Sequence, residues 1–295
     1  MLALVIAPAI VLGIIQGAVY GLVAVGLVLI YKSTRIFNFA AGEFATIAAF
    51  GTYLTKDSVG YYPALLVGIL AAVATALLVE RLIIWPLSDR PRVTLLVATA
   101  ATAISLIALQ FVFGAGGKIF SARDTVVGGK FAEIFGVNVS YQQLVVLLML
   151  LVVGVGLALF FAFTDTGLAT LATSQEPTAS RLVGIRLSRV SMLVWGMAGL
   201  LGGLAGVLLP PLTGNFTGAF GTIDLLIPAF TAAVLGGMTS IPGAFVGGLS
   251  LGVIQNLASF NISSDRLPGA TSVAVLIVLV GILLARPSGL LGKEA

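Results

Sequence analysis

Residues 1–31 read MLALVIAPAIVLGIIQGAVYGLVAVGLVLIY and contain no charged side chain. A helix that crosses a bilayer core of about 30 Å needs roughly 20 consecutive apolar residues. The stretch exceeds that length. It also exceeds the apolar region of a signal peptide, which is about 7 to 15 residues long and follows a basic segment. We therefore expect a retained transmembrane helix at the start of the sequence.

Long apolar stretches with few or no charges recur along the chain. Of its 295 residues 59% are hydrophobic and 9% are charged, whereas soluble domains carry about 25% charged residues. Further stretches free of charge, or nearly so, lie at 36–55 (which holds Glu43), 58–79, 93–117, 134–164, 190–223, 225–264 and 267–285. The longest contains the turn formers GGMTSIPG at 236–243, which divide it into two helices. The prediction is an all-α, polytopic membrane protein with about 8–9 transmembrane helices in a single domain, 1–295.

Basic residues predict the orientation, because cytoplasmic loops are enriched in Lys and Arg. With the polar 164–190 loop and the C-terminus in the cytoplasm, ten basic residues lie inside and five outside, which predicts an outside N-terminus. The five outside are Lys56, Lys118, Arg123, Lys130 and Arg266, and the ten inside include Lys32, Arg35, Arg181 and Lys293.

The sizeable extracytoplasmic segment is 114–141. Gly128-Gly129 suits a tight hairpin turn between the arms 125–127 and 130–131. A docking surface for an external partner and a solvated connector are both open interpretations of this segment.

Glycine makes up 36 of the 295 residues, and many glycines are spaced four apart. This spacing lets helices approach closely in lipid. The pattern favours packing inside the bundle over a dimer interface. The spaced glycines are Gly13, Gly17 and Gly21, then Gly199 with Gly203, Gly202 with Gly206, Gly243 with Gly247, and Gly248 with Gly252.

The composition excludes several kinds of chemistry. There is no Cys and no His, and no P-loop motif, so we expect no catalytic site, no metal site and no bound cofactor. The net charge of +4 is scattered over the loops, which argues against nucleic-acid binding.

The 164–190 loop reads TDTGLATLATSQEPTASRLVGIRLSRV and predicts two short helices. The first covers about 167–173; the second begins at Pro177 and stops at Gly184. Leu182, Val183 and Ile185 would form an apolar side of the second helix. Such a helix suits insertion into the groove of a partner protein, and a helix lying on the membrane surface is the alternative.

Four stretches resemble the branched-chain amino acid permease family of bacterial ABC importers. They are GAVYGLVAVGLVLIYKSTRIFNFAAGEF at 17–44, SQEPTASRLVGI at 174–185, FTAAVLGGMTSIPGAFVGG at 230–248 and RPSGLLG at 286–292. The resemblance implies a multi-pass subunit of the bacterial cytoplasmic membrane. Its expected partners are a second, homologous permease, two cytoplasmic ATPases that use ATP and Mg²⁺, and an extracytoplasmic solute-binding protein.

The resemblance also implies an ATPase-coupling loop. It places that loop at Glu176, Pro177, Ala179, Arg181, Leu182, Gly184 and Ile185, while Thr178 and Ser180 stand where the family has Glu and Ala.

Polar residues inside the apolar stretches are candidates for the translocation pathway. Inserting a carboxylate at the depth of the bilayer core costs roughly 2.5 to 3.5 kcal/mol of free energy. Glu43 is expected to be the one acid well inside a span, which makes it a functional candidate. Glu43 either lines the pathway or anchors helices within the bundle. The neutral candidates are Asn38, Gln110, Asn215, Gln255 and Asn256.

Asn38-Phe39 with Gly42 and Phe44 resembles the segment Asn215 to Phe220 on the opposite side of the membrane. The match fits an inverted repeat, but chance similarity in so biased a composition is the favoured interpretation.

The overall expectation is alternating access driven by partner ATPases, with a branched-chain amino acid or a related amide or urea as solute. The alternative is an ion-coupled secondary transporter, which would need a buried ionisable pair.

Overall fold

A computed structural model describes residues 2–115, 118–261, 270–286 and 288–292. Arg266 and Lys293, two of the basic residues that predict the orientation, lie outside these ranges. The helical elements are α1 (Leu2–Thr34), α2 (Ala41–Val59), α3 (Tyr61–Val79) with η1 (Glu80–Ile84) and η2 (Trp85–Leu87), α4 (Arg92–Gln110) with η3 (Phe111–Ala115), α5 (Tyr141–Phe163), α6 (Asp165–Gln175), α7 (Pro177–Leu182), α8 (Leu187–Leu208), α9 (Pro210–Thr213), η4 (Gly221–Leu226) with α10 (Ile227–Gly236), α11 (Ile241–Asn261) and α12 (Ala270–Ala285). The strands are β1 (Ile119–Ser121), β2 (Lys130–Ile134), β3 (Val137–Ser140) and β4 (Asn215–Thr217).

The all-α membrane class is confirmed. In the described residues six helices are long and apolar enough to cross a membrane, and two shorter apolar helices, Gly221–Gly236 and Val273–Ala285, accompany them. The predicted break in 225–264 is also confirmed, because α10 ends at Gly236 and α11 begins at Ile241.

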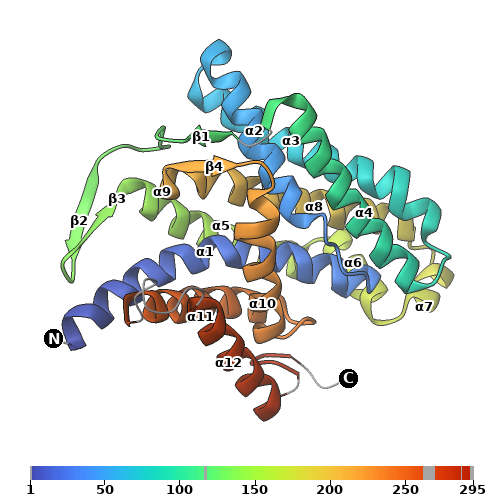
Figure 1. Cartoon of the computed structure of the whole chain (residues 1–295). Helices are drawn as coiled ribbons and strands as arrows, with labels where there is room; N and C mark the ends of the chain where they lie inside the picture. The colour runs from blue at the N-terminus through green and yellow to red at the C-terminus, as the bar shows by residue number, and fades with distance from the viewer. Residues whose placement is uncertain (1, 116–117, 262–269, 287, 293–295) are drawn as a thin grey trace.

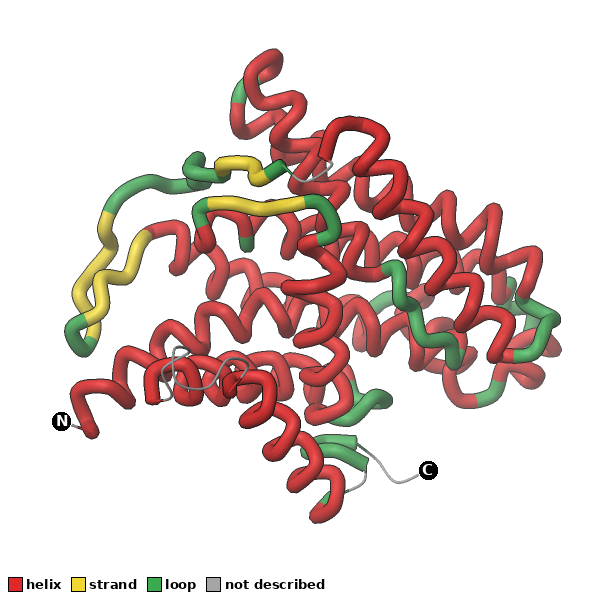
Figure 2. The backbone as a smooth tube through the Cα atoms, in the orientation of Figure 1, coloured by secondary structure: helices red, strands yellow, loops and turns green. Residues whose placement is uncertain are grey.

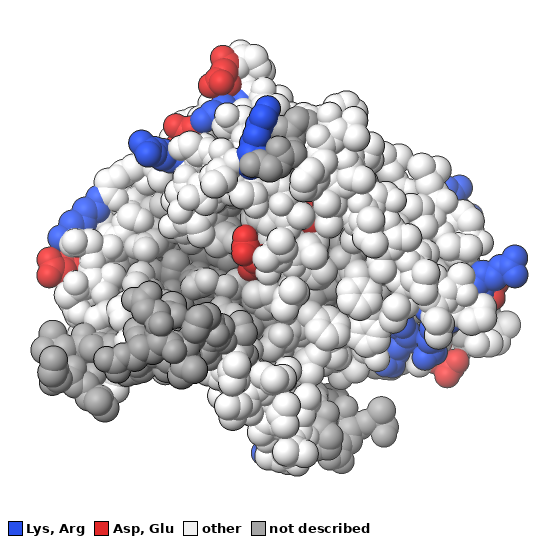
Figure 3. Space-filling view, viewed as in Figure 1, with Lys and Arg blue, Asp and Glu red and all other residues white. Residues whose placement is uncertain are grey.

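The elements define two ends of the molecule. Figure 1 shows the β2–β3 hairpin and the N-terminus at one end, which we call the hairpin end, and α7 at the other, which we call the loop end. Figure 2 shows that the strands gather toward the hairpin end while the remainder is helical. Most of the Lys and Arg side chains in this view lie toward these two ends, and the surface between them is mostly uncharged, with acidic side chains near its middle (Figure 3). The uncharged part of this surface is expected to face lipid.

The hairpin prediction placed the turn wrongly. Strand β2 pairs with β3 and the chain turns at Phe135 and Gly136, where φ is +51° and +80°. A two-residue hairpin turn of this kind needs positive φ at both central positions. At Gly128-Gly129 only Gly129 has positive φ, and its carbonyl accepts a hydrogen bond from Tyr141 N. Gly129 therefore fixes the base of the hairpin rather than its tip.

Close glycine contacts hold α1 against α11. A Cβ added at Gly17 would lie 2.6 Å from the carbonyl oxygen of Gly248, and one at Gly13 would lie 2.6 Å from the Cα of Val253. The other spaced glycines also pack within the chain: Gly199 meets Ala76 of α3, and Gly202 meets Phe44 of α2. In lipid, where apolar burial gives no net drive between helices, such contacts supply van der Waals attraction at backbone distance. Packing inside the bundle is therefore confirmed for these glycines.

We predict that Gly17→Ala lowers stability by about 1–3 kcal/mol, because the added methyl group forces α1 away from α11. The measurement is the thermal unfolding midpoint of the purified protein, followed by tryptophan fluorescence. Gly156→Ala on α5 is the matched control, since a Cβ there meets nothing within 4 Å. Equal midpoints for the two variants would contradict the packing argument.

Candidate functional site

A buried carboxylate joins three separate elements. Glu43 lies in the first turn of α2 and is fully buried. One of its oxygens accepts a hydrogen bond from Gln110 Nε2 at 2.6 Å, and the other accepts one from Thr222 Oγ1 at 2.5 Å. The carboxylate thus links α2 to the end of α4 and to η4. This is the geometry expected of an anchor within the bundle.

The network continues through backbone groups. Ala219 N donates to Gln110 Oε1 at 3.1 Å, and Gly221 N donates to Thr46 Oγ1 at 3.0 Å. A Cβ at Gly42 would lie 2.6 Å from the carbonyl carbon of Gly221. Gly42 of the first similar segment therefore contacts Gly221, the residue that directly follows the second segment.

Two further acids lie inside apolar segments, so the view that Glu43 alone does so is wrong. Glu80 is fully buried where η1 packs against α8, within the span Tyr61–Leu87. Asp224 belongs to the apolar helix Gly221–Gly236 and is exposed. Counting charge-free stretches treats such an acid as the boundary between two spans. The available signal was the long apolar sequence on both sides of Asp224.

Asp224 lines a cavity of about 690 Å³, which we call the Asp224 cavity. Residues of α1, β4, η4, α10, α11 and α12 form its wall. Polar groups at its surface include Gln16, Tyr20, Asn215 and Gln255, and apolar groups include Phe220 and Leu276. The volume lies within the roughly 300–1,000 Å³ that is typical of small-molecule sites.

The six pathway candidates divide into groups. Asn215 and Gln255 share the Asp224 cavity, whereas Glu43 and Gln110 bond to each other in the interior. Asn38 lines a separate cavity of about 250 Å³ with Phe37 and Phe39. Asn256 Nδ2 donates to Gln16 Oε1 at 2.9 Å and so bridges α11 and α1.

The 164–190 segment folds as the two predicted short helices. Helix α6 is capped by Thr164, whose Oγ1 accepts from Gly167 N, and α7 begins at Pro177. At the end of α7, Gly184 has a φ of +87°; its N–H donates to Arg181 O and the N–H of Ile185 donates to Ser180 O. This pair of bonds is the Schellman motif, which favours glycine at the left-handed position.

The same segment exposes apolar surface. Leu182 is 85% exposed and Val183 is 77% exposed. A cavity of about 670 Å³ lies beside them, between α6 and the start of α8, with Leu168, Ile185 and Arg189 in its lining. An apolar, arginine-edged surface at the loop end can therefore accept another protein chain.

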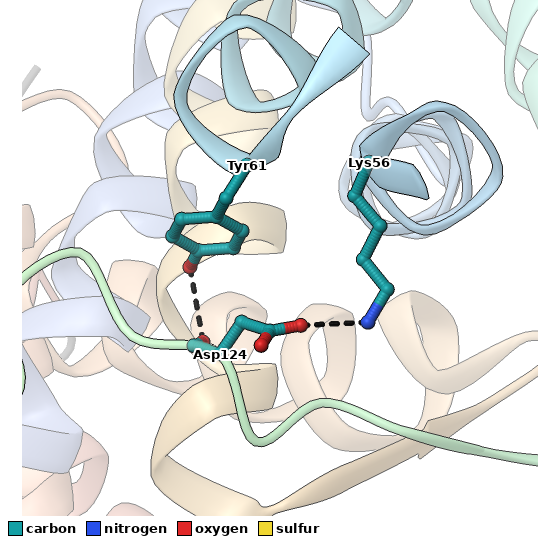
Figure 4. Close-up of polar contacts among 3 residues, drawn as sticks. All are labelled: Lys56, Tyr61 and Asp124. Carbon is teal, nitrogen blue, oxygen red and sulfur yellow. Dashed lines mark hydrogen bonds and ion pairs between the residues drawn. The ribbon is translucent and has the colours of Figure 1, made fainter. Parts of the chain in front are cut away.

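At the hairpin end a strap, residues 119–126, is tied to α2 and α3. Lys56 Nζ lies 2.6 Å from Asp124 Oδ2, and Tyr61 OH donates to the carbonyl oxygen of Asp124 at 3.0 Å (Figure 4). Strand β1 within the strap pairs with β4, which places Phe120 on Phe216 with ring centroids 5.3 Å apart. The strap thus connects the contacts of Asp124 with Lys56 and Tyr61 to the wall of the Asp224 cavity, because Phe216 lines that cavity.

Known proteins resemble the chain over nearly its whole length. BraD of Pseudomonas aeruginosa, named a high-affinity branched-chain amino acid transport system permease protein, is 30% identical and the match covers 95% of this chain and 94% of BraD. LivH of Escherichia coli K12, which carries the same description, is 29% identical over 95% of this chain and 94% of LivH. A probable LivH of Methanocaldococcus jannaschii is 29% identical over 92% of this chain and 88% of its own length.

A solved structure shows a similar fold. PsaBC from Streptococcus pneumoniae in complex with Fab gives a TM-score of 0.50 at 13% identity, covering 93% of this chain and 89% of that one.

Residues 9–285 match the family described as branched-chain amino acid transport system / permease component. The chain therefore belongs to this family of permease components.

Proposed function

We propose that this chain is the membrane-spanning permease subunit of an ATP-driven importer and moves a small polar solute by alternating access. The observation that carries the proposal is the exposed α6–α7 segment in a chain that belongs to a permease family. The subunit itself would perform no covalent chemistry. ATP with Mg²⁺ would be hydrolysed by two partner ATPases.

The loop end is the proposed cytoplasmic side. The positive-inside rule supports this assignment, and Arg181, Arg186 and Arg189 lie in or next to the loop. Helix α7 would insert Leu182 and Val183 into a groove of the ATPase, so that closure of the ATPases displaces α7 and α8 together. The proposed coupling contacts remain Glu176, Pro177, Ala179, Arg181, Leu182, Gly184 and Ile185.

The other proposed partners complete the pathway and deliver the solute. A second permease would cover the open side of the Asp224 cavity, and a solute-binding protein would dock at the hairpin end, which is the proposed outer face of the bacterial cytoplasmic membrane. The names of the relatives support a branched-chain amino acid as solute. A related amide or urea is the other solute class that we propose to test.

An ion-coupled transporter is the second candidate. The observation that favours it is the presence of Glu80 and Asp224 inside apolar segments, because intramembrane acids often bind coupling ions. It would need neither ATPases nor the exposed surface of α7.

Reconstitution separates the two candidates. We predict that the chain, assembled with its partner permease, ATPases and binding protein in proteoliposomes, accumulates labelled L-leucine or urea only when ATP is enclosed on the ATPase side. The measurement is uptake with and without ATP. Accumulation by the chain alone, driven by a sodium or proton gradient without nucleotide, would favour the ion-coupled transporter.

We predict that Gly184→Val in the same assembly lowers solute uptake per ATP hydrolysed by at least tenfold. A branched residue at a φ of +87° breaks the Schellman motif and turns α7 away from its partner. The measurement is the ratio of uptake to ATP hydrolysis.

Gly60→Val is the matched control for backbone strain. Gly60 has a φ of +86° and, like Gly184, open space around its missing Cβ, but it lies between α2 and α3. We expect this control to keep the wild-type ratio. An unchanged ratio in Gly184→Val, or an equal loss in both variants, would refute the coupling assignment.

A further inference from the structure

A cavity that the proposed function does not use lies where α1 and α5 end and α11 begins. Its volume is about 880 Å³, and we call it the basic cavity. Lys32 and Arg35, at the end of α1, form part of its wall. Among the residues that the structure describes, its lining contains no Asp and no Glu. The electrostatic potential of this lining therefore favours an anionic ligand over a cationic one.

The polar and apolar parts of the basic cavity lie at different depths. The hydroxyl groups of Thr239 and Ser240 belong to the turn that precedes α11, beyond the ends of the long helices. Leu157 lies six residues before the end of α5 and Phe245 four residues after the start of α11, which places them roughly 9 Å and 6 Å inside the helix ends at about 1.5 Å per residue. The cavity is thus polar at the helix ends and apolar toward the middle of the membrane.

One side of the basic cavity is continuous with surface that is expected to face lipid. Ala158 of α5 and Val246 of α11 line the cavity and are exposed. On the same helix as Ala158, Val155 is 50% exposed and Leu159 is 52% exposed. A molecule bound in the cavity can therefore place an apolar part in the bilayer. A small soluble anion would contact the polar part of the wall and leave the apolar part uncovered.

The backbone at Arg35 is a second, independent observation. Arg35 has a φ of +56°, a left-handed conformation that favours glycine. Its N–H donates to Tyr31 O at 2.8 Å, and its guanidinium carbon lies 5.9 Å from the centroid of the Tyr31 ring. The cation–π contact keeps the guanidinium beside the last turn of α1, at the wall of the cavity. A residue held in a disfavoured conformation is a basis for assigning a function to its side chain.

We propose that the basic cavity is a binding site for an anionic phospholipid, with the lipid phosphate on Arg35 and Lys32. Basic pockets between membrane-spanning helices, at the membrane boundary, suit acidic lipid headgroups. Thr239 and Ser240 are further hydrogen-bond donors to the phosphate, and an acyl chain lies along Leu157. The site needs only the membrane fold and is independent of the proposed function. A bound lipid would join α1 and α5 to α6, because Leu171, Ser174 and Gln175 of α6 also line the cavity.

The first test is native mass spectrometry of the full chain, purified in detergent and titrated with phosphatidylglycerol or phosphatidylcholine of the same acyl chains. We predict that the wild type binds phosphatidylglycerol at least tenfold more tightly. Arg35→Gly should lower the affinity for phosphatidylglycerol about fivefold, the effect of one basic residue near an anionic headgroup, and should leave the affinity for phosphatidylcholine unchanged. Arg35→Lys keeps the charge and should stay within twofold of the wild type.

Arg90→Gly is the matched control. It removes an exposed arginine between η2 and α4, outside the basic cavity, and should keep the wild-type affinity for both lipids. Equal affinity of the wild type for the two lipids would overturn the proposal. An affinity of Arg35→Gly for phosphatidylglycerol within twofold of the wild type, or an equal loss in Arg90→Gly, would also overturn it.

The second test needs no variant and stays informative if Arg35→Gly fails to fold. Glycerol 3-phosphate carries the phosphate of the headgroup without acyl chains, and it competes with bound phosphatidylglycerol on the wild-type chain. We expect less than a tenth of the lipid to be displaced by a hundredfold excess, because the apolar wall contributes to binding. Full displacement would show that the cavity binds a soluble anion and would overturn the lipid assignment.

The third test repeats the lipid measurement on the chain assembled with its partner permease and ATPases. We expect one phosphatidylglycerol molecule to remain bound for each copy of this chain. Loss of the lipid when the ATPases are added would assign the basic cavity to a protein interface and would overturn the proposal. None of the three tests measures transport, so failure of ATP-dependent uptake contradicts the proposed function alone.

Discussion

The hydrogen bonds of one buried carboxylate join separate parts of the structure. Glu43 accepts them from Gln110 and Thr222, which come from two other parts of the chain. Neither α2 nor η4 begins with a capping side chain of its own. Free N–H groups at a helix start need partners wherever water is absent. Thr46 supplies one of them by accepting from Gly221 N, so the network fixes the place where two helices begin.

The glycines make this arrangement possible. Gly42 and Gly221 approach so closely that a side chain at either position would collide with the other backbone. The absence of a side chain likewise lets α8 pack closely against α2 at Gly202 and against α3 at Gly199. Since α8 follows α7 directly in the chain, the exposed helix at the loop end is joined through backbone-distance contacts to α2 and its network. A displacement of α7 would thus be transmitted to α2 through closely packed backbone rather than through flexible side chains.

The sequence allowed the class of fold, the break at 236–243 and the two helices of the 164–190 loop to be predicted, because each depends on local signals: apolar length, Pro177 at a helix start and Gly184 at a helix end. The turn of the β2–β3 hairpin could not be placed in this way. Phe135 adopts positive φ there, which its residue type disfavours, and the pairing of β2 with β3 outweighs the local preference of Gly128-Gly129. The partners of Glu43 are 67 and 179 residues away in sequence, a separation at which no spacing rule applies.

Asp224 was missed for a more instructive reason. In the sequence, an acid between two apolar stretches resembles a loop residue that separates two membrane spans. The structure is needed to distinguish such a residue from an acid on a continuous apolar helix. The contrast with Glu43 then separates the two interpretations of an intramembrane acid. Where protein donors satisfy both oxygens, the carboxylate stabilises the bundle and has little capacity left for a ligand. Where the carboxylate is exposed at a cavity, as that of Asp224 is, its oxygens stay accessible to water and to any ligand that enters.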